Sequence, residues 1–277
     1  MDTEARVAGH YARGGGLEAA ILQALADAGK DPERLAPEDL APLEEFHTGG
    51  RQATIDLAAR MGLCPGLTLL DIGCGIGGAA RFLAREHGCR VTGIDLTAEY
   101  VAVAKALTRR VGLEAAVSFR QGSALTLPFA DGEFEGAYML HVGMNISDKA
   151  ALFEGVRRVL RPGAVFGVYD VMRLGPGELD FPLPWASMAE ASFVEEPAAY
   201  RQALLAAGFT IEAERERREF GLKGLRATLD LLARSALPRL GTQLLMGEEH
   251  YPGKIANQAA ALERGLVGPV EIIARAC

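Results

Sequence analysis

An acidic residue followed by a glycine cluster is the part of this sequence whose residue types and spacing could do chemistry. Residues 71–78 (DIGCGIGG) join a short apolar run to a segment with helical periodicity. Glycines at such a junction let the backbone turn tightly and let a ligand lie against it. By spacing alone, Gly73, Gly75 and Gly78 match the pattern GxGxxG, which is typical of dinucleotide-binding proteins.

The carboxylate of Asp71 separates two classes of nucleotide ligand. A pyrophosphate binds well at a helix N-terminus, and a carboxylate beside it would repel it. S-adenosylmethionine (SAM) has no phosphate and carries an ammonium and a sulfonium, so it suits an acidic strand end better. Two interpretations therefore stand side by side, namely a SAM-binding protein and an NAD(P)-dependent oxidoreductase, with Asp71 disfavouring the second.

Asp95 follows Asp71 at the end of the next apolar run. A carboxylate there can accept two hydrogen bonds from ribose hydroxyls, and these bonds are strong because the acceptor is ionised. Leu96, its neighbour, could pack against adenine. Alternatively, Asp95 caps the helix that follows. NAD and SAM both contain this ribose, so Asp95 does not discriminate between them.

Two more motifs follow in the order of a known family. Residues 122–129 (GSALTLPF) and 160–163 (LRPG) come after the glycine loop and the GID of residues 93–95. The sequence resembles class I SAM-dependent methyltransferases of the small-molecule type, which commonly carry DxGCGxG, GID, GDAxxLPF and LRPG in this order. The resemblance covers about residues 64–170. It implies SAM as methyl donor and S-adenosylhomocysteine as product.

The resemblance also implies which residues bind the cofactor. The expected contacts are Asp71, Gly73, Gly75, Asp95, Leu96, Ser123, Ala124 and His141. The family usually has an aspartate in place of Ser123, and its carboxylate binds the adenine amino group. A serine hydroxyl can still accept a hydrogen bond, but more weakly.

The flanking segments resemble a narrower group. Residues 45–51 (EFHTGGR) and 141–149 (HVGMNISDK) are similar to bacterial methyltransferases related to sarcosine/dimethylglycine and other amine- or phenol-methylating enzymes. Relatives use the position of His141 to contact the methionine part of SAM. Several carry a histidine at Asn145, which in some assists proton removal.

His141 and Asn145 are the expected catalytic residues. Methyl transfer from a sulfonium is an in-line displacement, so the enzyme mainly has to align the reacting atoms and exclude water. A protonated amine or phenol would additionally need a proton acceptor, and His141 is the candidate because histidine titrates near neutral pH. Its alternative is a hydrogen-bonding or packing role. Asn145 cannot act as a base and would orient substrate or stabilise a turn.

Three other residues could belong to the acceptor site. Asp170 ends a predicted strand and could bind a cationic amine, or serve as a cap or surface residue. Trp185 could line the acceptor site or pack in the core. His47 lies in a segment that resembles a lid, where a cap or core role is the alternative.

The elements that position these residues alternate between strand and helix. Short apolar runs at 68–72, 90–95, 117–120, 136–140 and 165–169 are separated by helical segments, which predicts a parallel sheet covered on both faces. Residues 209–214 and 269–274 are further strand candidates. The resemblance implies a Rossmann-like α/β fold with seven strands, the last antiparallel.

The domain organisation follows from where these motifs lie. Residues 1–62 are predicted to be a helical lid segment, with Asp31–Pro42 as loop because it contains three prolines. Residues 63–277 would form the methyltransferase domain, with a helical insertion at about 222–265. This insertion could be a dimer surface or a wall of the acceptor pocket.

Composition excludes several classes of protein. The 277 residues are 49% hydrophobic with a net charge of −7, which disfavours a duplex nucleic-acid partner. No apolar run is long enough to span a membrane, and the start lacks a secretory signal, so a cytoplasmic enzyme is expected. The four cysteines show no metal-ligand spacing, and no metal is expected.

The sequence as a whole predicts a SAM-dependent methyltransferase that acts on a small-molecule N, O or C nucleophile of amine or phenol/quinol type. The protein could also form a homodimer. Two alternatives stand beside this function: an NAD(P)-dependent oxidoreductase, and a SAM-binding protein without catalysis, which the Ser123 and Asn145 departures would allow.

Overall fold

A single mixed sheet forms the centre of the molecule. The computed structural model describes residues 3–277. The strands are β1 (Thr68–Ile72), β2 (Arg90–Asp95), β3 (Val117–Gln121), β4 (Phe134–Leu140), β5 (Leu160–Arg173), β6 (Phe209–Glu216) and β7 (Val267–Ala276). Their order is β3-β2-β1-β4-β5-β7-β6. β7 runs antiparallel to β5 and β6, whereas β1 to β5 are parallel. The predicted seven-stranded α/β fold with an antiparallel last strand is confirmed.

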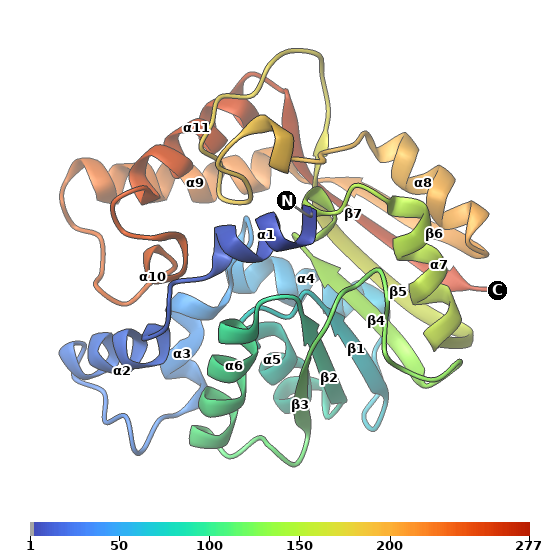
Figure 1. Cartoon of the computed structure of the whole chain (residues 1–277), viewed down its shortest axis with the longest axis horizontal. Coiled ribbons are helices and arrows are strands. Elements are labelled where there is room, and N and C mark those ends of the chain that lie inside the picture. Colours follow the sequence, from blue (N-terminus) through green and yellow to red (C-terminus); the bar gives the residue numbers. More distant parts are fainter. Residues whose placement is uncertain (1–2) are drawn as a thin grey trace.

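Helices surround this sheet (Figure 1). They are α1 (Thr3–Tyr11), α2 (Leu17–Asp27), α3 (Pro37–Glu44), α4 (Gly50–Met61), α5 (Gly78–His87), α6 (Ala98–Arg110), α7 (Lys149–Val159), α8 (Pro197–Ala206), α9 (Arg218–Ala233), α10 (Gln243–Met246) and α11 (Tyr251–Glu263), with short 3₁₀ turns at Gly143–Asn145 and Ala189–Ala191.

The two faces of the sheet are buried against different helices. Because side chains alternate along a strand, Ala137 and Met139 of β4 pack with α7 and α8, while Tyr138 packs with α4, α5 and α6. The same alternation holds on β5, where Phe166 and Tyr169 lie in the two different clusters. The strands are therefore apolar on both sides, as parallel sheets require.

The expected loop at Asp31–Pro42 is only partly a loop, and this prediction is corrected. Helix α3 begins at Pro37, because a proline at the first helical position loses no hydrogen bond. Leu40 and Leu43 are fully buried on its inner face. Burial of these side chains outweighs the break that Pro42 would otherwise cause.

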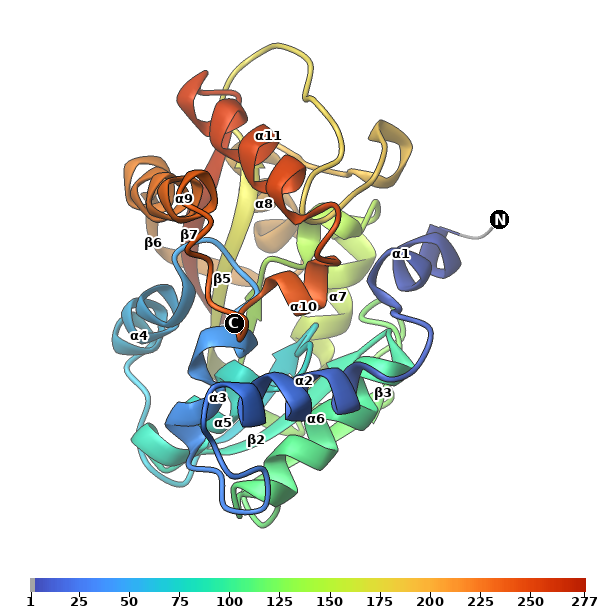
Figure 2. The same cartoon turned by 90° about the vertical axis from the view of Figure 1, so that its left-hand side faces the viewer.

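Three helices separate β6 from β7 in the sequence. Helices α9, α10 and α11 lie within 218–263, where the sequence predicts a helical insertion at about 222–265, and the insertion stays a prediction. In Figure 2, α9 and α11 lie above and α2, α3, α5 and α6 lie below, while α10 lies between these two groups and contacts α2 and α3. The division into a lid at 1–62 and a domain at 63–277 stays a prediction, and its first two residues lie outside the described ones.

Asp170 takes neither the amine-binding role nor the surface role that its position suggested, and it accepts from the amide of Gly143, which begins the 3₁₀ turn, as a cap would. It is fully buried in β5, and Tyr200 of α8 donates a hydrogen bond to its Oδ2 at 2.7 Å. Burial raises the pKa of Asp170 to about 6. The carboxyl thus ties α8 to the sheet and does not reach the surface of a pocket.

Replacing Tyr200 by phenylalanine should destabilise the fold in a pH-dependent way. Above the Asp170 pKa of about 6 the carboxylate is charged and the lost donor is worth more. We expect the free energy of unfolding to fall by about 1.5–3 kcal/mol at pH 8 and by about 0.5–1.5 kcal/mol at pH 5. Urea unfolding at both pH values measures this. Equal losses of unfolding free energy at the two pH values would contradict a hydrogen bond from Tyr200 that is stronger to the charged form of Asp170.

Candidate functional site

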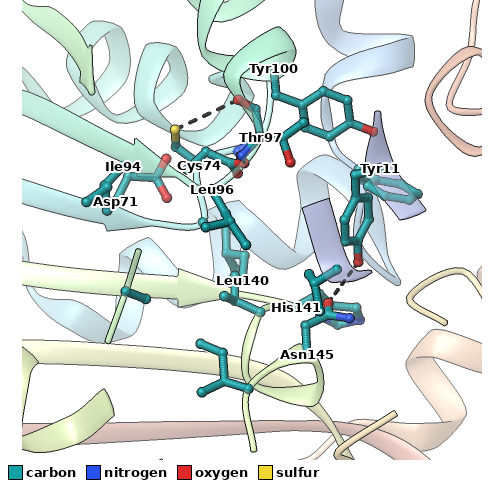
Figure 3. A pocket seen from close by; sticks show the side chains of 18 of the residues that line it. Tyr11, Asp71, Cys74, Ile94, Leu96, Thr97, Tyr100, Leu140, His141 and Asn145 are labelled. Atoms are coloured by element: carbon teal, nitrogen blue, oxygen red, sulfur yellow. Dashed lines mark hydrogen bonds between the residues drawn. The ribbon is translucent and has the colours of Figure 1, made fainter. Parts of the chain in front are cut away.

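A cavity of about 480 Å³ lies at the carboxyl ends of β1, β2, β3 and β4. Figure 3 shows Asp71 and Leu96 on the sheet side and Tyr11 facing them from α1. All the residues that the sequence singled out for cofactor binding or catalysis line this one cavity: Asp71, Gly73, Gly75, Asp95, Leu96, Ser123, Ala124, His141 and Asn145. Their individual roles stay predictions.

The glycine loop brings the backbone against the neighbouring strand. The amides of Gly73 and Cys74 both donate to the Ile94 carbonyl, at 2.8 and 3.0 Å. Gly73 has φ +68°, and a Cβ there would overlap Val142. Gly75 has φ +53°, and a Cβ there would meet no atom within 4 Å. The missing side chain at Gly75 therefore leaves open space at the cavity wall.

A buried carboxyl group, Asp71, and a half-buried one, Asp95, share this wall. Burial raises the pKa of Asp71 to about 8, and the negative charge of Asp95 adds to the shift. Oδ2 of Asp71 is buried without a well-formed hydrogen bond, and the buried Tyr138 hydroxyl lies beside this carboxyl and opposes the rise in its pKa. Asp95 is better satisfied, since it accepts from Gly75 N at 2.9 Å and Thr97 N at 2.8 Å, although burial also raises its pKa. A bound cation would lower the pKa of Asp71 and stabilise its charged form, so the site suits a cation or hydrogen-bond donors.

His141 is held by both of its ring nitrogens. Its Nε2 accepts from the Thr48 amide at 3.2 Å, and its Nδ1 donates to the Tyr169 carbonyl at 3.2 Å. These two partners fix one neutral tautomer. Burial lowers the pKa of His141 to about 3. The residue also adopts φ +57°, which is rare outside glycine and shows that the surroundings hold it firmly.

Asn145 also has both ends of its side chain occupied. Oδ1 accepts from the Tyr11 hydroxyl at 2.8 Å, and Nδ2 donates to the Trp185 carbonyl at 2.8 Å. Figure 3 shows the contact between Tyr11 and Asn145. This amide therefore joins helix α1 to the segment around Trp185, next to the strand ends.

A second cavity of about 240 Å³ adjoins the first. Tyr11, Glu45, Phe46, His47 and His141 line both cavities. The remaining wall is largely apolar and comes from the insertion and the Trp185 segment: Met144, Pro184, Trp185, Leu225, Met246, Tyr251 and Ile255, with Thr228, Thr242 and Gln258 as polar members. Of the two roles weighed for the insertion, the cavity wall is the one that these residues occupy.

His47 sits where the two cavities meet, and its tautomer can be read from its partners. Nε2 lies 3.1 Å from the Gly50 carbonyl, which can only accept, so Nε2 carries the proton. Nε2 also lies 3.5 Å from Glu45 Oε2. Burial lowers the pKa of His47 to about 4. Within residues 3–277 no group bonds to Nδ1, so His47 keeps a free lone pair.

Glu4 and Tyr11 of α1 and Leu245 of α10 also line the first cavity and were missed in the sequence. They lie more than 50 residues from the glycine loop, and no spacing rule connects them to it. The only available signal was the amphipathic pattern of the first helix, which does not indicate what the helix covers.

Within residues 3–277, no group of three His, Cys, Asp or Glu side chains could hold a metal ion. In the same residues, no helix is long and apolar enough to cross a membrane.

Residues 70–168 match the family model described as a methyltransferase domain. These residues form a methyltransferase domain. The match covers the glycine loop, Asp95, Ser123 and both catalytic candidates, whereas Tyr11, Glu45 and Leu245 of the cavity wall lie outside the matched residues. The recognition made from the ordered motifs is confirmed.

Similarity to known proteins extends beyond the methyltransferase domain. Phosphoethanolamine N-methyltransferase 1 of Zea mays is 28% identical over 221 residues, which are 80% of this chain and 43% of that protein. The chain spans between 30% and 51% of the length of the first curated relatives it matches. Similarity to them therefore does not by itself assign an activity to the whole protein.

Two solved structures share the fold over nearly the whole chain. Geranyl diphosphate C-methyltransferase from Streptomyces coelicolor A3(2) has a TM-score of 0.72 at 18% identity and covers 100% of this chain and 98% of its own. The [4+2]-cyclase SpnF has a TM-score of 0.65 at 24% identity and covers 94% and 95%. Since one of these is titled a cyclase, the fold alone does not fix the reaction.

Replacing Tyr11 by phenylalanine tests whether its hydroxyl fastens α1. The variant loses the hydrogen bond to Asn145, so we expect amide exchange in residues 3–11 to speed up by about 5- to 10-fold, the equivalent of about 1 kcal/mol. Hydrogen exchange measured by mass spectrometry reports this. Tyr251→Phe, which removes another hydroxyl from the second cavity, is the control and should leave α1 unchanged. Unaltered exchange in Tyr11→Phe would show that other contacts hold the helix.

Proposed function

We propose that the protein transfers a methyl group from SAM to a small molecule. The observation that carries this proposal is the pair of adjoining cavities. The larger follows the strand ends and has acidic walls, and the smaller is largely apolar. They meet at Tyr11, His47 and His141, which is where a methyl group would pass from donor to acceptor.

The residues of the larger cavity fit SAM. Asp71 Oδ2 is a buried acceptor without a well-formed hydrogen bond, and an ammonium group would satisfy it. The space left at Gly75 allows a ligand to lie close to the backbone. Asp95 can accept from the ribose hydroxyls through its remaining lone pairs. When bound, SAM supplies an activated methyl group on a sulfonium, so the protein needs no metal for this step.

The protein contributes alignment of the reacting atoms and exclusion of water from the site. Tyr11 and Phe46 close over the junction of the cavities, and Trp185 is almost fully buried in the wall of the smaller one. The acceptor atom is thereby held in line with the methyl group, and water is kept out. Ser123, Ala124 and Leu96 hold the other end of the cofactor.

The smaller cavity favours a neutral, largely apolar acceptor of the phenol or quinol kind. Its wall contains one carboxylate, Glu45, which already pairs with Arg51 Nε at 2.6 Å and accepts from Thr54 at 2.8 Å. An ammonium substrate would have to compete with the Arg51 guanidinium for this carboxylate. Ring-shaped apolar acceptors can instead pack against Trp185, Met144 and Leu225.

His141 and His47 have different roles in this proposal. His141 uses both nitrogens on the backbone, so it positions Thr48 and the strand end instead of accepting a substrate proton. His47 has the free Nδ1 and accepts the proton of a phenolic acceptor. Glu45, near Nε2, stabilises the resulting imidazolium. Asn145 positions Tyr11.

Both alternative functions, the NAD(P)-dependent oxidoreductase and the SAM-binding protein without catalysis, fit the site less well than methyl transfer does. Asp71 would place a buried carboxylate next to the pyrophosphate of NAD(P), and no comparison supports an oxidoreductase. A SAM-binding protein without catalysis would not need the apolar second cavity.

Four finer points belong to the same proposal. A bacterial origin rests on the resemblance of the flanking segments, and a cytoplasmic location on the composition. The acidic charge supports the absence of a nucleic-acid partner, and a homodimer stays open to a sedimentation measurement.

Calorimetry of Asp95→Ala tests the cofactor assignment. The variant loses two charge-assisted hydrogen bonds to ribose, so we expect SAM affinity to fall by at least about 100-fold. Unchanged affinity would refute the ribose contact. NAD titrated into the unaltered protein is the control for the class of ligand and should give no heat.

The two histidines can be separated by kinetics with a phenolic acceptor found by screening for S-adenosylhomocysteine release. His47→Gln should lower kcat by roughly 100-fold or more, the usual range for loss of a general base. It should also remove the fall in rate below about pH 4, where His47 would be protonated. His141→Gln is the matched variant and should keep that pH profile. The opposite pattern would return the base role to His141.

A further inference from the structure

The loop after β3 contains a polar contact that the proposed function does not use. Ser123 stands at the adenine position of the motif with a hydroxyl in place of a carboxylate. Its Oγ accepts from the Leu125 amide at 3.0 Å and donates to Oε1 of Glu4. Glu4 belongs to α1, so a carboxylate from a distant segment reaches the place where the motif lacks one. Both residues line the larger cavity.

The geometry of the two cavities fixes which end of the cofactor lies there. The methyl group has to face the second cavity, which joins the first at His47 and His141. Asp95 lies in the middle, at the end of β2, and holds the ribose. The base therefore extends the other way, over the end of β3, where Ser123 and Glu4 are. This step rests on the proposed function.

We propose that Glu4 recognises the exocyclic amino group of adenine. Its Oε1 takes the Ser123 hydroxyl, and in the described part of the chain no group donates to its Oε2. An ionised carboxylate accepts an N–H more strongly than a hydroxyl does. Ser123 then acts as the positioning residue, since its hydroxyl orients Glu4 while the Leu125 amide orients the hydroxyl.

This assignment makes α1 part of the cofactor site. His10 fastens the helix to the Pro184 carbonyl at 2.9 Å, and Tyr11 fastens it to Asn145. The amino group can be recognised only when α1 is docked. Binding of the adenine ring and docking of the helix therefore favour each other.

The test compares two ligands that differ at this edge of the base. S-adenosylhomocysteine carries the amino group and an unprotonated N1, whereas S-inosylhomocysteine carries a carbonyl, which a carboxylate repels, and a proton on N1. Calorimetry with the full chain should show the adenosyl ligand preferred by at least about 10-fold, one charge-assisted hydrogen bond. In Glu4→Gln the preference should vanish or reverse, because the amide can donate to the inosine carbonyl. Glu18→Gln, an exposed change on α2, is the matched control and should keep the preference.

A second variant guards against an indirect effect of the substitution. Adding Ser123→Asp to Glu4→Gln places a carboxylate on the sheet side of the same position and should restore the preference for the adenosyl ligand. A preference that is the same in the unaltered protein and in Glu4→Gln overturns the role of Glu4, and so does failure of the restoring change. If the unaltered protein binds neither ligand, the proposed cofactor itself is wrong.

Discussion

The burial of one carboxyl group is the constraint on which the cavity at the strand ends depends. Asp71 lies near the end of β1, where burial raises its pKa to about 8; the Tyr138 hydroxyl lies beside it, and Oδ2 makes no well-formed hydrogen bond. Leaving such an atom unsatisfied costs stability. The surrounding fold tolerates this cost because both faces of the sheet are packed with apolar side chains. The neighbouring elements shape the cavity in front of Asp71.

The space is shaped by segments that lie far apart in the chain. The glycine loop and Asp95 form its floor, α1 covers it, and the insertion between β6 and β7 forms the wall of the adjoining cavity. His141 and Asn145 connect these parts, since one binds the backbone of Thr48 and the other binds Tyr11 and the Trp185 carbonyl. His141 and Asn145 therefore have a structural role in addition to a chemical one, because they hold in place the wall that the two cavities share.

Local sequence patterns predicted the strands of the sheet and the glycine loop at the cavity floor. They did not predict that α1 covers the cavity. The parallel strands and the residues of the glycine loop follow from apolar runs and ordered motifs, which are short-range features, whereas the antiparallel last strand was implied by the family resemblance. Tyr11 and Glu4 come into contact with Asn145 and Ser123 across more than 100 residues, and no periodicity encodes such a contact. The pairing of both His141 nitrogens likewise depends on tertiary structure. Prolines misled the prediction for α3, because the burial of Leu40 and Leu43 decides there.

The way α1 is attached has a consequence for turnover. The helix has no buried residue, and hydrogen bonds from Arg6, His10, Tyr11 and Arg13 hold it in place. Detaching it costs less than unfolding, because Tyr11, which packs beside Phe46 and Tyr100, is the main apolar contact that is lost. One small motion thus exposes both cavities at once. The residence times of nucleotide and acceptor are then set by the same event, and a slow step in the catalytic cycle would belong to the departure of products instead of the transfer of the methyl group.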